Sequence, residues 1–119
     1  MAEKTVFEKI RDREIPAQFV YEDEQVMAFR DINPVAPVHV LIVPKFPYPT
    51  LEDVPMNDQI MTTLIVTARQ VAAQLGIDKN YRLLMNVGPG VQEVMHVHLH
   101  LLGGWRDPRP DDPESSKLV

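Results

Sequence analysis

Residues 96 to 101 alternate between histidine and aliphatic side chains, and this alternation limits the local structure more than any other feature of the chain. The segment reads His-Val-His-Leu-His-Leu. In an extended strand successive side chains point to opposite faces, so the histidines share one face and the aliphatic residues enter the core on the other. Three of the four histidines of the chain lie here. Because imidazole titrates and coordinates near neutral pH, we expect a functional site on the histidine face.

Length and composition limit the fold and the class of partner. A chain of 119 residues is expected to form one domain. Without cysteine it has no disulfide, no thiolate metal ligand and no cysteine nucleophile. The net charge of −5 opposes binding of a nucleic-acid polymer. No long apolar run and no signal-peptide pattern is visible, so we expect a cytoplasmic protein that binds no membrane.

Hydrophobic periodicity predicts two helices of different length. Residues 5–8 (Thr-Val-Phe-Glu) fit a capping box for a short N-terminal helix, which ends before Pro16. From residue 60 to residue 75 apolar side chains recur at helical spacing, which predicts a long amphipathic helix. Asn57 is the predicted cap at its start, and Gly76 the residue that ends it.

Five further segments have the composition of β-strands. The first two form a predicted hairpin and the third, apolar except for one histidine, a central strand. Their predicted ranges are 19–21, 26–29, 38–43, 81–85 and 94–102. The order of elements predicts an α+β fold with a five-stranded antiparallel sheet, one short N-terminal helix and one long helix. Residues 1–104 form the domain, and residues 105–119 a Pro-rich acidic tail that is flexible or contacts a partner subunit.

Two kinds of chemistry use a row of histidines. Zinc could be bound by two histidines at positions i and i+2, with His39 or Glu93 completing the site. All three histidines of the row can hardly reach one ion, because the Cα atoms of His96 and His100 are about 13 Å apart on a strand. The other chemistry is covalent catalysis, in which one imidazole attacks an electrophile such as phosphorus while its neighbours orient it and protonate the leaving group.

The histidine segment also carries a family resemblance. With Leu102 it matches the His-φ-His-φ-His-φ-φ signature of the histidine triad (HIT) superfamily, where φ is an apolar residue. Other segments resemble the Hint branch, the purine nucleoside phosphoramidases, in order and spacing. These segments are Phe7-Glu8-Lys9-Ile10, Arg13-Glu14-Ile15-Pro16, Ala28-Phe29-Arg30-Asp31-Ile32, Pro34, Ala36-Pro37, His39 and Ile42-Val43-Pro44-Lys45. The resemblance covers about residues 5–104.

The resemblance implies a two-fold homodimer with a HIT-like fold that hydrolyses the P–N bond of AMP or GMP phosphoramidates through a nucleotidyl-histidine intermediate. It implies no metal and no cofactor. In the family pattern His98 is the nucleophile, His100 contacts the α-phosphate or the leaving group, and His96 and His39 support them. The remaining residues that it implies are Asp31 for the ribose hydroxyls, Val6, Phe7, Ile10, Phe29 and Ile32 for the base, and Asn86, Gly90, Gln92, Glu93 and Val94 for nucleotide binding near the phosphate.

Two other functions remain open, both in the same pocket. One is a non-catalytic nucleotide sensor or scaffold, and the other a dinucleoside polyphosphate hydrolase of the same superfamily. His100 stands where the transferase branch carries glutamine, which favours hydrolysis over transfer. The loop 86–92 departs from the family pattern, because Val91 replaces a second glycine and the loop is one residue shorter. Ile65 and Val66 widen the apolar face of the long helix, which favours a homodimer.

Overall fold

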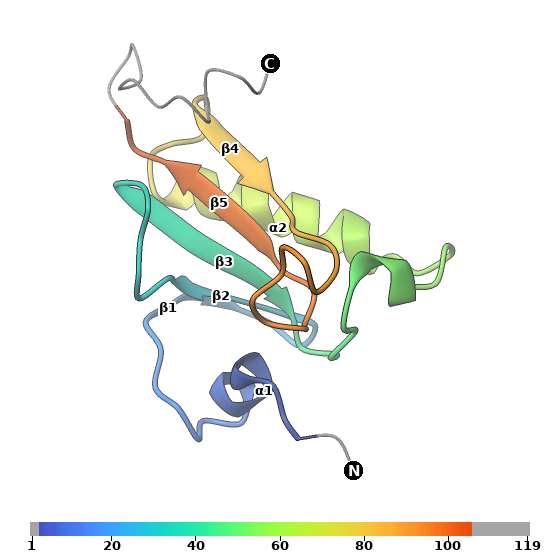
Figure 1. Ribbon diagram of the computed structural model, residues 1–119. Helices are drawn as coiled ribbons and strands as arrows, with labels where there is room; N and C mark the ends of the chain where they lie inside the picture. The colour runs from blue at the N-terminus through green and yellow to red at the C-terminus, as the bar shows by residue number, and fades with distance from the viewer. Residues whose placement is uncertain (1–2, 106–119) are drawn as a thin grey trace.

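The fold consists of a five-stranded antiparallel sheet and two α-helices, which confirms the predicted class (Figure 1). It is taken from a computed structural model that describes residues 3–105. Apart from Trp105, the predicted tail lies outside the described residues. No helix within residues 3–105 has the length and apolar character needed to cross a membrane. The elements are α1 (Val6–Arg11), β1 (Phe19–Glu22), β2 (Val26–Arg30), β3 (Val38–Pro44), a 3₁₀ helix (Leu51–Asp53), α2 (Ile60–Gln74), β4 (Tyr81–Leu84) and β5 (Leu99–Gly103).

The sheet has the strand order β1-β2-β3-β5-β4, so β3 lies at its centre, as its apolar sequence predicts (Figure 1). Its central place explains why both faces of β3 are buried. In the register of the sheet His100 lies opposite Leu41 on one side and opposite Leu84 on the other. His39 pairs with Leu102, which makes it the diagonal neighbour of His100 on the same face.

Alternating side chains divide the core into two layers. On β2 and β3 the even-numbered residues Val26, Ala28, Val40 and Ile42 pack against α2, together with Leu99 and Leu101 of β5. The odd-numbered residues Met27, Phe29, Leu41 and Val43 pack on the other face, against Phe7 and Ile10 of α1. Helix α2 crosses one whole face of the sheet, whereas the six-residue helix α1 is too short to cover the other (Figure 1). The uncovered part of that second face carries the cavity.

The start of α1 and the end of α2 agree with the sequence, whereas the start of α2 does not. Helix α1 has the predicted capping box, in which the Glu8 amide donates to the Thr5 hydroxyl and the Thr5 amide donates to the Glu8 carboxylate. Gly76, with a φ of 76°, follows the last turn of α2. The predicted cap at Asn57 is wrong, because the Asp58 carboxylate accepts from the Ile60 amide instead, at 2.9 Å.

The predicted strand 94–102 is wrong at its start, since β5 begins only at Leu99. In the register of the sheet, a longer β5 would bring Val97 opposite Pro44, the last residue of β3. Proline has no N–H to donate to a strand ladder, so the pairing ends there. The chain bends instead, with the His96 amide donating to the Val94 carbonyl and the Val97 amide donating to the Tyr48 carbonyl. The alternation of faces persists nevertheless, because Val97 packs with α2 while His96 and His98 contact Phe7.

Candidate active site

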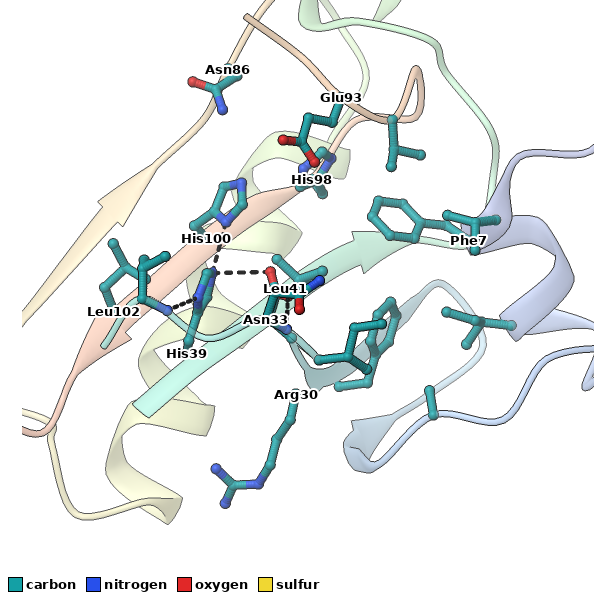
Figure 2. A pocket seen from close by; sticks show the side chains of 18 of the residues that line it. Phe7, Arg30, Asn33, His39, Leu41, Asn86, Glu93, His98, His100 and Leu102 are labelled. Atoms are coloured by element: carbon teal, nitrogen blue, oxygen red, sulfur yellow. Dashed lines mark hydrogen bonds and ion pairs between the residues drawn. The ribbon is translucent and has the colours of Figure 1, made fainter. Parts of the chain in front are cut away.

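A cavity of about 570 Å³ lies on the face of the sheet that α2 leaves free, between α1, the strands and the segment before β5 (Figure 2). This volume is within the range of small-molecule sites. Three of the predicted site residues, His96, Gly90 and Gln92, do not line it. The other twelve do: Val6, Phe7, Ile10, Phe29, Asp31, Ile32, His39, Asn86, Glu93, Val94, His98 and His100.

His96 lies behind the cavity, fully buried, and its two ring nitrogens have fixed partners. Its Nε2 is 2.7 Å from the Pro44 carbonyl oxygen, and its Nδ1 is 3.0 Å from the Thr5 hydroxyl. A carbonyl can only accept, so Nε2 carries the proton and Nδ1 accepts from the Thr5 hydroxyl. His96 therefore connects the cap of α1 to the end of β3.

His98 lines the cavity and is held by the backbone of its own segment. Its Nδ1 is 2.7 Å from the carbonyl oxygen of His96, which accepts the Nδ1 proton. In the neutral ring the other nitrogen, Nε2, then has a free lone pair. Phe7 packs edge-on against the ring, with 4.9 Å between centroids, and limits its rotation. The arrangement presents an unprotonated nitrogen that has no hydrogen-bond partner among residues 3–105.

His39 and His100 form a second fixed pair, from adjacent strands (Figure 2). The Val35 amide donates to Nδ1 of His39 at 3.1 Å, so the proton of the neutral His39 ring is on Nε2. That nitrogen is 2.9 Å from Nδ1 of His100 and 3.4 Å from Oδ2 of Asp31. Nδ1 of His100 accepts, which leaves the His100 proton on Nε2. The rings of His98 and His100 lie 4.9 Å apart between centroids. Nε2 of His98 is an acceptor and Nε2 of His100 is a donor, so the pair offers one of each.

Burial keeps these histidines neutral. It is the largest cause that lowers the pKa of His39, His96 and His98 below the ordinary value of 6.5. For His98 this effect exceeds the opposite effects of the His96 carbonyl and of the Asp31 and Glu93 carboxylates. Burial, with the neighbouring His98 and His39, lowers the pKa of His100 to about 4. At pH 7 all four rings are therefore neutral, as the proton positions above require.

Hydrogen bonds from the Gln92 side chain hold the loop before the histidine segment together, and this side chain does not line the cavity. The buried Gln92 amide group accepts from the Gly88 amide and donates to the Pro49 and Val94 carbonyls, at 2.7–3.0 Å. The backbone amides of Val91 and Gln92 both donate to the Gly88 carbonyl, at 3.2 and 2.8 Å. These two amides are therefore occupied within the loop. Val91, in contrast, lines the cavity with a side chain that is 60% exposed.

Comparisons with known proteins show the family of the chain. The family model "HIT domain" matches residues 12–107. The chain belongs to the HIT family. It is 50% identical over 107 residues to the purine nucleoside phosphoramidase of Escherichia coli K12, covering 87% of this chain and 90% of the relative. It is 47% identical over 104 residues to the 14 kDa zinc-binding protein of Zea mays, covering 84% and 81%.

Solved structures of HIT proteins have the same fold. The crystal structure of a HIT family hydrolase from Legionella pneumophila Philadelphia 1 matches with a TM-score of 0.83 and 44% identity, covering 90% of this chain and 98% of that one. A histidine triad protein from Clostridium difficile matches with a TM-score of 0.84 and 41% identity, covering 93% and 100%. The histidine row therefore lies on a HIT scaffold.

One group in this HIT site has the geometry to hold a metal ion. One ligand atom from each of Asp31, His39 and His100 lies within 4.8 Å of the others. The zinc pair at positions i and i+2 is not brought together in this way, because the group contains His100 but neither His96 nor His98. In the described residues these groups already contact one another, through the His39–His100 hydrogen bond and the 3.4 Å contact between His39 and Asp31. They offer three ligands where a closed zinc site takes four.

Two contributors to the HIT site were missed by the sequence reasoning. The sequence predicts only a capping role for the Thr5 hydroxyl, although the hydroxyl also donates to Nδ1 of His96, 91 positions away. The Val35 amide, which fixes the proton of His39, belongs to a loop in which no side chain suggests that role. A helix cap near the N-terminus and a buried histidine are each ordinary features. Only the fold brings them to the histidine row.

Proposed function

We propose that this protein hydrolyses purine nucleoside phosphoramidates, with His98 as the nucleophile. The observation that carries the proposal is the fixed proton on Nδ1 of His98, which leaves Nε2 free in the cavity. A neutral imidazole with a defined acceptor nitrogen attacks phosphorus without prior deprotonation. The name of the E. coli relative supports the P–N bond as the one cleaved.

In the proposed reaction Nε2 of His98 attacks the α-phosphorus, a P–N bond to the ring forms, and the P–N bond to the leaving group breaks. The leaving nitrogen takes the electron pair and a proton from water at the open mouth of the cavity, and departs as an amine. Nε2–H of His100 donates to a phosphoryl oxygen or the leaving nitrogen, which stabilises the developing charge. Water then attacks phosphorus, releases its proton to solvent, and the P–N bond to His98 breaks to give the nucleoside monophosphate.

The rest of the cavity fits a nucleoside. The Asp31 carboxylate can accept from both hydroxyls of a ribose, since a carboxylate has two acceptor oxygens. Phe7, Ile10 and Phe29 form an apolar wall beside it that suits a flat base. Asn86 lines the opposite part of the cavity and can donate to the phosphate (Figure 2). We assign base, ribose and phosphate sites to these residues.

The test is turnover of adenosine 5′-phosphoramidate by the wild type and the His98→Ala variant. We expect the variant to lose hydrolysis and to retain AMP binding, because the base and ribose contacts remain. In an acid-quenched single turnover, the wild type should carry a covalent adenylate that mass spectrometry assigns to His98. A wild type that binds AMP but hydrolyses no nucleoside phosphoramidate would instead support the sensor function.

The proposal includes a cytoplasmic homodimer. On α2 the side chains of Ile65 and Val66 are 41% and 53% exposed, on the surface turned away from the sheet. A two-fold partner would bury these side chains, and such dimers are the commonest oligomers. Sedimentation equilibrium at micromolar concentration should give twice the 13.6 kDa chain mass. A monomeric mass would contradict the dimer without affecting the reaction.

A further inference from the structure

Glu93 places a carboxylate beside the histidine that attacks phosphorus in the proposed reaction. Its side chain is exposed and lines the cavity with His98, and Figure 2 shows its carboxylate beside the His98 ring. The two groups are close enough for the carboxylate to raise the pKa of His98 against the larger effect of burial. A phosphoramidate held there would bring its own negative charge next to this carboxylate.

The cavity offers little to compensate for that repulsion. Among its described lining residues the only lysine or arginine is Arg30, and Figure 2 shows its side chain extending away from the histidines. The histidines are neutral at pH 7 because burial lowers their pKa values. No ion-pair partner of Glu93 lies within residues 3–105.

The second acidic group of the cavity differs from Glu93, because Asp31 has partners. One of its oxygens accepts from the Asn33 amide at 2.8 Å, and the other is 3.4 Å from Nε2 of His39. The Asn33 amide thus holds Asp31 at the ribose side, with the His39 ring beside it. Glu93 remains the charged group available to a substrate near the reacting phosphorus.

We propose that Glu93 selects substrates whose leaving group is cationic, such as phosphoramidates of diamines or of amino acids that keep a free ammonium group. This inference rests on the proposed reaction at His98. In an in-line displacement the leaving nitrogen lies opposite Nε2 of His98, and its substituent extends into the cavity that the exposed Glu93 side chain lines. A short aminoalkyl arm on that nitrogen can place its ammonium between the phosphate and Glu93. The ammonium then attracts both the phosphate and the Glu93 carboxylate, which would otherwise repel each other.

Two substrates of equal shape that differ only in the charge of the leaving group test this proposal. One is adenosine 5′-phosphoramidate carrying N-propyl, and the other carries N-(2-aminoethyl), in which an ammonium replaces the terminal methyl. The quantity measured is the ratio of kcat/KM for the cationic substrate to kcat/KM for the neutral one. Glu93→Gln should lower this ratio roughly two- to fivefold, the range of an exposed ion pair. Glu93→Lys should lower it further, and added salt should reduce the ratio of the wild type.

Glu24→Gln is the matched control, because it makes the same change in net charge at the exposed turn between β1 and β2. It should leave the ratio unchanged. If Glu93→Gln slows both substrates equally, the carboxylate acts on the chemistry and not on the leaving group, which overturns the inference and leaves the proposed reaction standing. An unchanged ratio overturns it too. A wild type that hydrolyses neither substrate overturns the proposed function and this inference with it.

Discussion

The hydroxyl of Thr5 has two partners, and its removal should destabilise the fold more than the loss of an ordinary helix cap. It accepts from the Glu8 amide at 3.1 Å and donates to Nδ1 of His96 at 3.0 Å. Thr5→Val keeps the shape of the side chain and removes both interactions. Loss of an N-cap costs about 1 kcal/mol. An unpaired buried acceptor, here Nδ1 of a fully buried ring, costs about 1–3 kcal/mol more.

The free energy of unfolding, measured by urea denaturation, should therefore fall by roughly 2–4 kcal/mol in Thr5→Val. Thr5→Ser retains the hydroxyl and is the control, with a change below about 1 kcal/mol. Thr5→Asp separates the two interactions, because aspartate caps a helix as well as threonine does but donates no proton to His96. If Thr5→Asp is as stable as the wild type at pH 8, the hydroxyl serves only as a cap and the link to His96 is refuted.

Further predictions concern pH, packing and metal. Because burial lowers the pKa of His98, the acid limb of kcat/KM should lie below pH 6.5, and a limb above 6.5 would contradict the neutral nucleophile. Histidines of the unfolded chain become protonated near pH 6.5, whereas those of the folded protein become protonated only at lower pH, about 4 for His100. The unfolded state therefore binds more protons between pH 6.5 and about 4, and the urea midpoint should fall as the pH drops through this range. Gly103→Ala should cost about 1–3 kcal/mol, since a Cβ there would lie 2.7 Å from Cδ1 of Ile77. Chelator-treated protein free of zinc by elemental analysis should retain its activity, and restoration of lost activity by zinc alone would support the metal site.

The predictable part of the fold was the part set by local pattern. Composition marked most strands, alternation marked the histidine strand, helical periodicity marked α2, and the capping box marked the start of α1. The error at Asn57 arose because Asp58, one residue later, competes for the same role. The error at the start of β5 arose because a strand ends where its partner ends, and Pro44 belongs to a different segment.

The sequence predicted some parts of the candidate site and missed others. The histidine row and the residues implied by the family resemblance identified most of the cavity lining. The sequence did not reveal that Gln92 turns inward to brace its loop, or that the Val91 and Gln92 amides are occupied there. Every residue except proline has the same backbone N–H, so only the conformation of the loop decides which of these groups face a ligand.

By itself the sequence determined that three histidines share one face and that the opposite face is buried, since side chains of an extended chain alternate regardless of what surrounds them. Tertiary structure alone decided how these histidines differ. His96 lies behind the cavity with Thr5 and Pro44, His98 faces it with a free nitrogen, and His100 faces it with a proton that His39 fixes. Identical imidazoles differ in chemistry only through their burial and hydrogen-bond partners, and those partners come from segments that the fold brings together.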